Sequence, residues 1–584
     1  MKVTVAKTAG FCRGVRDALD VTLEAIKGLQ DGESICTFGP LIHNRQVLAM
    51  LEEKGIIAED KIENCAGKKV VIRAHGIPPQ ERKRLRRVGA SLLDATCKRV
   101  ARVQAAIKRH ARKGFHTVIV GDADHAEVIG LMGYTEGRGV VISRPEQVDE
   151  LPDNWDHVLL VAQTTQNEEI FRAIQERFRS KYPNSMIKNT ICGSTHERQS
   201  EVRQMRSQVE ALVIVGGYHS GNTIRLAEVA KECATPTYHV ETETELDAQE
   251  MKRYSSVGVS AGASTPNWMI RNVVRYLESI QPEQNDVRFT IKRILEPLVY
   301  SNVFVAFGAA LLTAAGQALT GNPGSLSYCL MAAFYVFAMH TLNLYLDRDA
   351  MRLNDPGRAA FYQHWKGIFT SISIAAVAVS LWMAAAAGVL AFLALGLLVL
   401  FGLLYAVPLF LPTWWQRLSV LKIKDIPASK TLFVPVAWAS TTVILPYLGN
   451  FWSNFQQTLY AFWIIALFVL IRTALLDFLA VQGDRLVGKE TIVVLLGETR
   501  TWHFISAILG LLAVSLMLGP ISGLSTAFAY AMLPGVVAYG WCLRMCLQKP
   551  LKEDPVFETI IESVLIGMGL CALLYNFIIT LWLT

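Results

Sequence analysis

The sequence contains ten cysteines but no C-x-x-C pair, so its spacing does not support a zinc ribbon or a ferredoxin-type cluster site. Its first half also lacks a basic patch interleaved with aromatic residues. The net charge of +7 therefore reflects basic loops and gives no indication of nucleic-acid binding. No apolar signal sequence opens the chain. We therefore expect the first half to stay in the cytosol, where thiols remain reduced and disulfides are rare.

The composition differs sharply between the two halves of the 584-residue chain. Residues 1–290 have dense charges and short apolar runs, as a soluble α/β protein has. From about Leu295 onward, long apolar runs dominate. The polar stretch 279–286 interrupts the pattern and predicts a boundary. We expect an α/β domain over 1–280, a linker over 281–294 and an all-helical, polytopic membrane domain over 295–584.

In the first half, strand-like apolar runs alternate with helical patterns. Such alternation predicts parallel sheets whose strands are joined by crossover helices. The expected strands are 3–6, 69–73, 91–97, 117–121, 157–161, 186–191, 211–215 and 257–259. Ligands collect at the carboxyl ends of strands in such folds, so the residues that follow these runs are the first candidates for a site.

Three cysteines, Cys12, Cys97 and Cys192, each follow a predicted strand and open a predicted helix, where backbone amides stabilise a thiolate. A lone cysteine in such a turn, like Cys12 between Gly10 and Gly14, is more often a buried apolar residue. Three in equivalent places, 85 and 95 residues apart, indicate three similar α/β units that each present one thiol. Three thiolates suit either a zinc ion or a cubic iron–sulfur cluster with one open iron.

Polar side chains gather in the same strand-end loops. His43, His75 and His125 lie there, and each alone would more often be a structural histidine. Together with Ser220, Asn222, Thr223 and Ser264 they form a set of donors suited to an anion such as diphosphate. Glu127 is the candidate proton donor, because a carboxyl in a semi-enclosed anionic site has a raised pKa.

Nine motifs occur in order over about residues 1–280: AGFCRGV, GPLIHN, RAHG, DATC, HAEV, QTT, ICGSTHERQ, HSGNTIRLAE and AGASTP. Through them the first half closely resembles the LytB family of 4-hydroxy-3-methylbut-2-enyl diphosphate reductases, which act last in the deoxyxylulose phosphate route to isoprenoid precursors. The resemblance implies three α/β units in a cloverleaf around a 4Fe-4S cluster. It also implies reductive removal of an allylic hydroxyl, with ferredoxin or flavodoxin as the electron donor.

Motif by motif, the resemblance assigns roles to residues of this chain. It makes Cys12, Cys97 and Cys192 the cluster ligands and places Glu127 in the proton relay. It assigns the substrate to His43, His75, His125, Thr164, Ser220, Asn222 and Ser264. Where the family often has a second serine before the asparagine, this chain has Gly221, whose backbone amide can still donate to a phosphate oxygen.

The second half contains nine apolar segments long enough to span a membrane, which takes about 20 residues. They lie at about 297–319, 325–346, 367–386, 388–411, 431–448, 457–479, 501–519, 523–543 and 560–582. Lysine and arginine occur only in alternate loops between these segments. This positive-inside pattern predicts a multi-pass protein of the cell inner membrane, with the first half in the cytoplasm.

The basic loops and segment ends also carry carboxylates and amides. The candidates are Asn343, Asp347 and Asp349 near the second segment, and Asp477 and Asp484 near the sixth. Carboxylates at a membrane interface are costly unless they bind something, and such oxygens suit Mg²⁺ bridging to a diphosphate. The alternative is a set of solvated interfacial charges, with Arg472 available to pair with Asp477.

This half resembles the UbiA superfamily of membrane prenyltransferases, which have nine helices and two aspartate-rich motifs. The matching motifs are N-x-x-x-D, N-D-P-G-R and G-D-R-x-x-G-K-x-T. The resemblance implies transfer from a polyprenyl diphosphate to an acceptor, within membrane lipid. The chain departs from the family at Leu344, Met351 and Ala480, where aspartates are usual. Two functions stay open for this half: a prenyl transferase, or a catalytically silent membrane anchor or lipid-binding domain.

Overall fold

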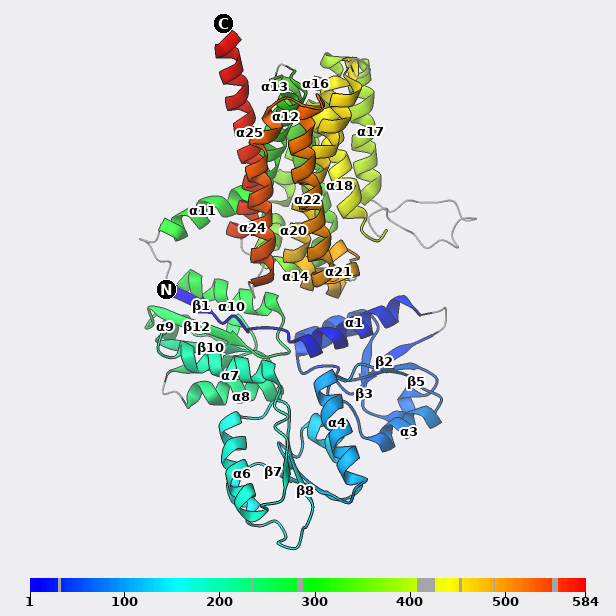
Figure 1. Cartoon of the computed structure of the whole chain (residues 1–584), viewed down its shortest axis with the longest axis vertical. Coiled ribbons are helices and arrows are strands. Elements are labelled where there is room, and N and C mark those ends of the chain that lie inside the picture. Colours follow the sequence, from blue (N-terminus) through cyan, green and yellow to red (C-terminus); the bar gives the residue numbers. More distant parts are fainter. Residues whose placement is uncertain are drawn as a thin grey trace. The chain divides into compact units, whose positions relative to one another are not determined.

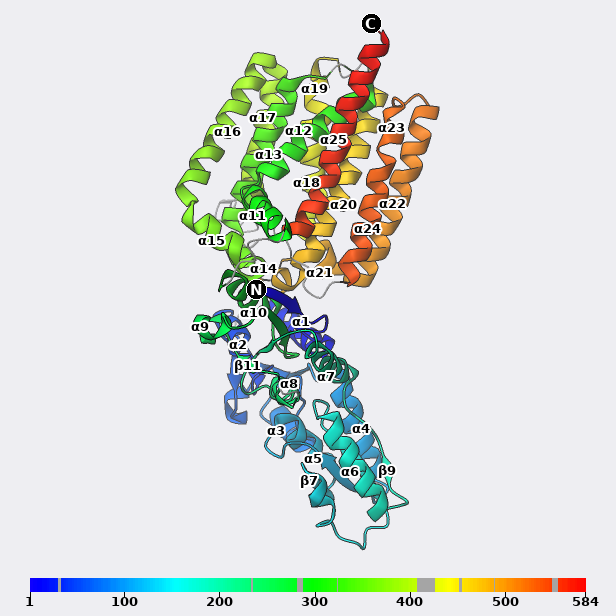
Figure 2. The ribbon, with the colours of Figure 1, turned by 90° about the vertical axis from the view of Figure 1, so that its left-hand side faces the viewer.

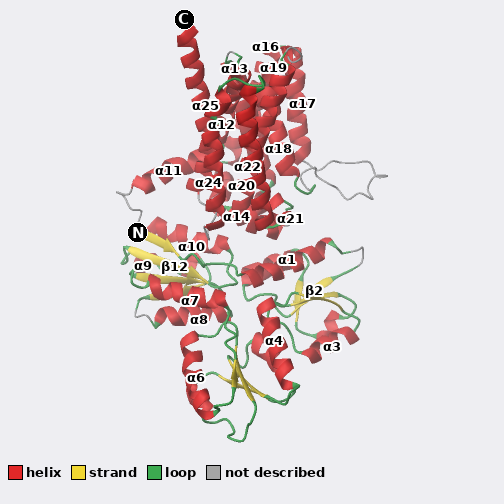
Figure 3. Cartoon of the chain, viewed as in Figure 1, coloured by secondary structure: helices red, strands yellow, loops and turns green. Residues whose placement is uncertain are grey.

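The computed structural model describes residues 1–29, 33–232, 235–280, 287–322, 324–406, 426–450, 454–487, 489–548 and 555–583. The chain forms two compact units, Met1–Glu283 and Gln284–Thr584, and each is described here by itself. All described strands lie in the first unit, and the second is helical (Figures 1 and 3). The predicted fold classes are confirmed. The predicted linker, 281–294, lies partly outside the described residues, and the domain bounds stay a prediction.

The first unit, which we call the α/β unit, contains three parallel sheets of four strands each, in the orders β1-β12-β10-β11, β3-β2-β4-β5 and β7-β6-β8-β9 (Figure 1). The strands are β1 Lys2–Val5, β2 Ile35–Phe38, β3 Ile57–Glu59, β4 Lys69–Ile72, β5 Ser91–Asp94, β6 His116–Val120, β7 Gly139–Ile142, β8 Val158–Ala162, β9 Met186–Ile187, β10 Ala211–Val215, β11 Thr237–Val240 and β12 Ser256–Ala261. The first sheet joins both ends of the unit, because Val3 of β1 pairs with Val257 of β12. The predicted set of three α/β units is confirmed.

Ten α-helices accompany these sheets. They are α1 Arg13–Lys27, α2 Arg45–Glu53, α3 Pro79–Arg87, α4 Lys98–Ala111, α5 Ala126–Met132, α6 Glu168–Lys181, α7 Gly193–Met205, α8 Gly221–Lys231, α9 Ala248–Met251 and α10 Asn267–Ile280. Their apolar residues recur at helical spacing and are buried, as Val15, Ala18 and Leu19 are in α1. Short 3₁₀ turns cover Ile62–Cys65, Pro145–Val148 and Glu243–Glu245.

The sequence prediction omits four strands and overextends two, one of which is β5, which ends at Asp94 where the expected strand continued to 97. Three of the omitted strands, β3, β7 and β11, lie at the edges of their sheets. Strand β9, another edge strand, has two residues where 186–191 was expected. Edge strands are short and half-exposed, so they carry little apolar signal. The fourth omission, β2, is a fully buried run of only four residues.

The second unit, which we call the helical unit, is a bundle of long helices (Figure 2). Its elements are α11 Val287–Tyr300, α12 Val303–Thr320, α13 Leu326–Leu346, α14 Arg348–Asn354, α15 Pro356–His364, α16 Lys366–Ala387, α17 Val389–Ala406, α18 Ser429–Ala439, a π-helix Ser440–Ile444, α19 Leu445–Tyr447, a 3₁₀ turn Leu448–Asn450, α20 Phe455–Val487, α21 Ile492–Leu496, α22 Glu498–Ile521, α23 Phe528–Ala531, α24 Leu533–Gln548 and α25 Pro555–Leu583. In the described part, six helices are long and apolar enough to cross a membrane. They are α12, α13, α16, α20, α22 and most of α25.

The other three predicted segments are covered by shorter or interrupted helices. They are α17, the α18–α19 stretch and the α23–α24 pair, while the part of 388–411 beyond residue 406 lies outside the described residues. The first span begins at Val303 instead of 297, because Asn302 adopts a positive φ of 61° that ends the preceding helix. Among the described residues, six of the nine predicted segments therefore match a helix that is long and apolar enough to span a membrane.

Helix α20 lies at the centre of the bundle and contacts α12, α14, α18, α22, α24 and α25. It runs to Val487, where the sequence predicts an end near 479. The extension places Asp484 on the helix, seven residues after Asp477. Two turns of helix separate these residues, so both carboxylates lie on one face of α20.

Candidate functional site

Each of the three predicted cluster cysteines occupies the position just before a helix begins. Cys12 precedes α1, Cys97 precedes α4 and Cys192 precedes α7. Their backbone N–H groups donate to carbonyls in strand-end loops, at Ala263 (3.0 Å), Ala74 (2.9 Å) and Thr164 (2.8 Å) respectively. Each thiol is therefore positioned at the carboxyl end of a different sheet, which is where ligands bind in parallel α/β folds.

The thiols of Cys97 and Cys12 lie close to Gly14. A Cβ atom placed on Gly14 would lie 2.5 Å from the sulfur of Cys97 and 3.9 Å from that of Cys12, so this helix turn needs glycine. Burial raises the pKa of the Cys97 thiol, and the charges of Cys12 and Cys192 add to that rise. This electrostatic influence indicates that the sulfurs of Cys12 and Cys192 both lie near that of Cys97. All three thiols are half-buried and free of disulfides.

The spacing of the sulfurs bears on which metal they could hold. Within the described ranges, His43, His75 and His125 are the only trio of potential metal ligands whose ligand atoms all lie within 4.8 Å of one another. A tetrahedral zinc site needs sulfurs about 3.8 Å apart, given a Zn–S bond of about 2.3 Å. At least one pair among the sulfurs of the three cysteines therefore lies more than 4.8 Å apart. This separation is wider than a single zinc ion requires and fits the corners of a polynuclear cluster better.

Arg198 of α7 is a functional candidate that the sequence reasoning missed. Its side chain is buried and donates to the carbonyl of Gly10 (2.6 Å) and to the carbonyl of Ser194 (3.0 Å). Burial lowers the pKa of Arg198, while the nearby thiols of Cys12 and Cys192 oppose that shift. A buried guanidinium beside two thiols offsets the negative charge of a thiolate site. Arg198 lies within the motif ICGSTHERQ, and its place in that motif is the sequence signal that could have identified it.

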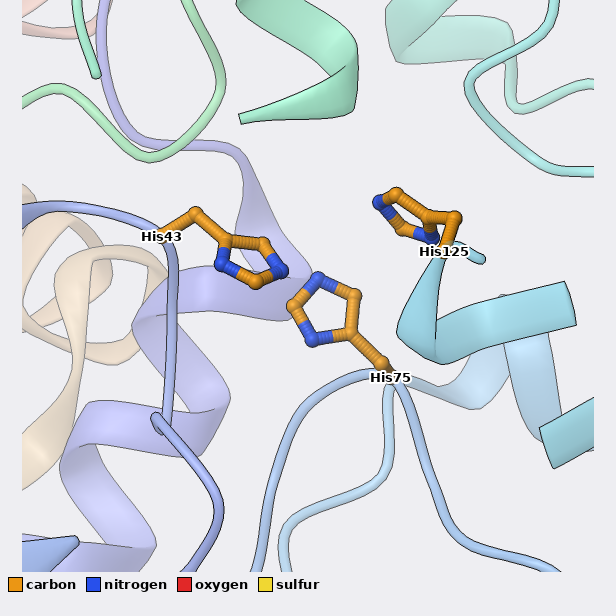
Figure 4. A group of neighbouring side chains, drawn as sticks. All are labelled: His43, His75 and His125. Atoms are coloured by element: carbon orange, nitrogen blue, oxygen red, sulfur yellow. The ribbon is translucent and has the colours of Figure 1, made fainter. Parts of the chain in front are cut away.

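The three predicted histidines face one another across a small space (Figure 4). Ring centroids are 4.6 Å apart for His43 and His75, 5.4 Å for His75 and His125, and 5.8 Å for His43 and His125. Nε2 of His43 and Nδ1 of His75 are buried without a hydrogen-bond partner in the described structure. Buried polar atoms in native proteins normally have partners, so these two nitrogens point to a ligand.

The histidines are held neutral in this pocket. Burial lowers the pKa of His43 to about 4, with the charges of His125 and Arg73 acting in the same direction. Burial likewise lowers the pKa values of His75 and His125, again assisted by Arg73. Arg73, from the motif RAHG, was not among the predicted site residues. A pocket with this guanidinium and three imidazoles that can accept protons is electrostatically prepared for an anion.

Glu127 is buried beside Thr164 at the start of α5. Its carboxylate accepts hydrogen bonds from the backbone N–H of Thr164 (2.7 Å) and from the hydroxyl of Thr164 (2.8 Å). Burial raises the pKa of Glu127 to about 7 despite these hydrogen bonds. The carbonyl of Thr164 in turn accepts from the backbone N–H of Cys192. Thr164 thus contacts both the candidate acid and the backbone of the third cysteine.

The loop before α8 supplies further polar groups to the same site. The hydroxyl of Ser264 donates to that of Ser220 (3.2 Å), and Nδ2 of Asn222 is buried without a partner in the described structure. A Cβ atom on Gly221 would lie 2.9 Å from Nε2 of His125. Glycine at this position therefore lets the histidine approach the N-terminus of α8. The structure brings together all the predicted substrate-binding residues, whose roles stay predictions.

Three of the predicted carboxylates of the helical unit, Asp347, Asp477 and Asp484, each have a partner. Lys430 donates to Asp477 (2.6 Å), Lys489 donates to Asp347 (2.8 Å), and Nδ2 of Asn354 donates to Asp484 (3.1 Å). The backbone N–H of Lys489 also donates to the carbonyl of Asp484, which joins the two motifs. Asn343 lies in the last turn of α13. The side chain of Asp349 lies outside the described residues.

Arg472 does not pair with Asp477, which corrects the sequence expectation. Instead it forms a bidentate, fully buried ion pair with Glu562 of α25, through Nε at 2.7 Å and a second hydrogen bond, and its guanidinium lies 4.9 Å from the ring centroid of Trp438. The pair joins two helices inside the bundle and keeps Arg472 away from the acidic motifs. Two buried charges are tolerated inside the bundle because each is the partner of the other.

The α/β unit defines a three-sheet protein with three neighbouring thiols and a buried group of three histidines, and the helical unit defines a multi-pass membrane protein. Residues 3–278 match the model of the family described as LytB protein, and residues 302–561 match the UbiA prenyltransferase family. The chain belongs to the LytB family and carries a UbiA prenyltransferase family domain.

Known relatives show how much of the chain this covers. The chain is 41% identical over 292 residues to a 4-hydroxy-3-methylbut-2-enyl diphosphate reductase of Opitutus terrae, covering 48% of this chain and all of the relative. A reductase of Plasmodium falciparum of solved structure is 25% identical, with a TM-score of 0.46, over 49% of this chain and 89% of that one. A UbiA homolog from Archaeoglobus fulgidus, bound to GPP and Mg²⁺, is 19% identical, with a TM-score of 0.34, over 48% of this chain and 98% of that one.

Proposed function

We propose that the α/β unit reduces 4-hydroxy-3-methylbut-2-enyl diphosphate to isopentenyl and dimethylallyl diphosphates. The observation that carries this proposal is one site with two halves: three converging thiols from three sheets, and an adjacent pocket of unpaired donors. Reductases of this name are among the relatives that the α/β unit matches over their full length.

Cys12, Cys97 and Cys192 would hold the cluster that the family implies. The donor set fits, because three half-buried thiols converge beside the buried guanidinium of Arg198 and no disulfide occupies them. A 4Fe-4S cluster bound there would supply electrons to the substrate and leave one iron open to it.

The chain's own residues would bind the substrate and deliver a proton. The histidines, Ser220, Asn222 and Ser264 would receive the diphosphate, with the N-terminal backbone of α8 at Gly221. Thr164 would lie at the allylic hydroxyl and Glu127 would protonate it through this contact. The C–O bond then breaks, two electrons enter, water leaves, and a second proton adds to carbon. A carboxyl with a pKa of about 7 is half protonated near neutral pH, as a general acid must be.

Anaerobic turnover tests this proposal. Purified full-length protein, reconstituted with iron and sulfide, should convert the hydroxylated diphosphate to both five-carbon products with reduced methyl viologen as the donor. A colourless, iron-free protein, or one that binds zinc and does not convert the hydroxylated diphosphate, would contradict the reductase proposal.

We further propose that the helical unit transfers a prenyl group from a polyprenyl diphosphate to an acceptor in the lipid phase. The supporting observation is the joining of both acidic motifs through Lys489. Oδ1 of Asn354, beside Asp484, is buried without a partner in the part of the unit that the structure describes. An unpaired amide oxygen among carboxylates fits Mg²⁺, provided that the lysines release Asp347 and Asp477. The family match does not favour a silent anchor.

Transfer assays distinguish these functions for the helical unit. Full-length protein in lipid nanodiscs would be incubated with Mg²⁺, a radiolabelled prenyl diphosphate and extracted membrane lipids. Formation of a prenylated lipid supports the transferase. Binding of the radiolabelled prenyl diphosphate without transfer of its prenyl group would instead support a lipid-binding domain.

We propose the cell inner membrane as the location, with the α/β unit in the cytoplasm and ferredoxin or flavodoxin as its electron donor. The basic loops predicted to be cytoplasmic support this orientation. Labelling of a Ser522→Cys variant with a membrane-impermeant thiol reagent, in intact and opened cells and against the wild type as background, would test it, because Ser522 is exposed directly after α22 in a loop without basic residues. Access from outside the cytoplasm is expected, and labelling only after the membrane is opened would contradict it.

A further inference from the structure

The exposed side of α4 is basic along its whole length. Arg102 and Arg109, seven residues apart, lie on one face of the helix, and Lys98 and Arg112 continue that face in both directions. The helix contains no aspartate or glutamate, and its opposite side buries Val100, Val103 and Ile107. We call Arg13, Lys98, Arg99, Arg102, Arg109 and Arg112 the basic face; all six are exposed.

The basic face has little internal compensation. Lys98 lies 3.9 Å from Asp17, but its side chain is 79% exposed, so this pair is weak. The described residues place no carboxylate within 4.0 Å of Arg99, Arg102 or Arg109. Uncompensated charge of one sign over four turns of helix creates a field that attracts an oppositely charged partner.

The basic face begins at the thiol site. Cys97 immediately precedes α4, and Cys12 immediately precedes Arg13. Two of the three thiols are therefore adjacent in sequence to exposed basic residues. A protein that docks on the first turns of α1 and α4 would lie close to the proposed cluster.

We propose that the basic face is the docking site of an acidic, protein-borne electron carrier. This inference rests on the proposed reductase function, which consumes two electrons per turnover and must draw them from outside the chain. Charge complementarity selects an acidic partner, and the position of the face at Cys97 and Cys12 selects a redox partner. An anionic lipid surface would match the charge but would leave the position at the thiols without a role.

Kinetics with two kinds of electron donor test the proposal on the full-length protein. The test variant is Arg102→Glu/Arg109→Glu, which reverses two charges beyond the first turn of α4. Arg99 is avoided because its backbone N–H contacts the Cys97 thiol. The matched control is Lys83→Glu/Arg87→Glu, which makes the same charge change on exposed positions of α3. Iron content and cluster absorbance show whether each variant is correctly loaded.

The test variant should keep its rate with reduced methyl viologen within about twofold. With an acidic ferredoxin its KM for the carrier should rise about tenfold or more, while kcat at saturation changes little. The wild-type rate with ferredoxin should fall as salt is raised, and the rate of the variant should respond less. The control variant should match the wild type throughout.

Several outcomes would overturn this docking site. They are an unchanged KM for ferredoxin in the test variant, or an equal rise in the α3 control. Loss of binding to phosphatidylglycerol vesicles with unaltered ferredoxin kinetics would assign the face to lipid. Absence of viologen turnover in the wild type would instead count against the reductase function itself, so the two failures are distinguishable.

Discussion

The two units present opposite solutions to holding a charged ligand. In the α/β unit, donors such as Nε2 of His43 and Nδ2 of Asn222 are buried and unpaired among the described residues. In the helical unit, Asp347 and Asp477 already carry lysine partners. The first site is preorganised for an anion, and the second must exchange partners before it can bind a cation. Preorganised sites bind without a reorganisation cost, whereas the second site has to break ion pairs first.

The difference follows from where each site is built. Loops at the carboxyl ends of three sheets fix the α/β site, so its donors stay in place without a ligand. The acidic motifs of the helical unit sit near helix ends and in loops, where long lysine side chains can reach them. Lys430 is 46% exposed while Asp477 is fully buried, so the lysine can swing away and the carboxylate cannot.

The largest expected effect is removal of a cluster thiol. Cys97→Ser should abolish bound iron and reduce turnover to the level of a protein-free control, because three ligands from three sheets act as one unit. Iron analysis and anaerobic turnover measure it. Cys571→Ser, which removes an exposed thiol of the helical unit, should leave both unchanged. Normal iron content in Cys97→Ser would refute the ligand assignment.

Glu127→Gln should lower turnover by about 10²- to 10⁴-fold with cluster absorbance intact, because it removes the proton donor. In the wild type, the acid form of a group with a pKa of about 7 is lost as pH rises, so turnover should decline above about pH 7. A pH profile of kcat measures this decline. Normal turnover of Glu127→Gln would show that the proton comes from elsewhere.

Thr164→Val supplies a milder version of the same test. It removes the hydroxyl that donates to the Glu127 carboxylate. The pKa of Glu127 should then rise further, and the decline in turnover should move to higher pH. If turnover of Thr164→Val declines at the same pH as that of the wild type, the pH dependence does not come from Glu127.

In the helical unit, lysine and metal should compete. Lys430→Met frees Asp477 and should tighten Mg²⁺ binding roughly tenfold, whereas Asp477→Asn should weaken it by a similar factor. Calorimetric titration of Mg²⁺ into the full-length protein with a bound prenyl diphosphate measures both. Lys366→Met, at an exposed position that starts α16, is the control. Equal Mg²⁺ affinity in all four proteins would mean that Asp477 is no metal ligand.

The smallest expected effect concerns protons in the α/β site. His43 has a pKa of about 4 when free, and a neighbouring diphosphate should raise it. Binding then takes up protons, so affinity for the substrate should increase a few-fold as pH falls from about 8 to 6. Calorimetry in two buffers of different ionisation enthalpy counts those protons. His43→Gln should take up fewer, and an unchanged count would exclude this imidazole.

Much of the α/β site could be predicted from the sequence because strand-end positions in parallel sheets converge. Cys12, Cys97 and Glu127 lie where the alternation of strands and helices indicates. Arg198 could not be found in this way, since a mid-helix arginine carries no sign of being buried. Neither could the partners of Asp477 and Arg472, which depend on side-chain packing between helices distant in sequence.

The placement of one thiol on each sheet also has a consequence for assembly. Segments of 85 and 95 residues separate the three cysteines, so a cluster that bridges them closes two long loops of chain. Closing a loop of that length restricts the unfolded chain by about 4.6 kcal/mol in an entropy model. Cluster insertion would therefore act like a removable cross-link among three separately formed sheets. Protein that has lost its iron should be cut faster by protease in the loops between them, while each sheet remains intact.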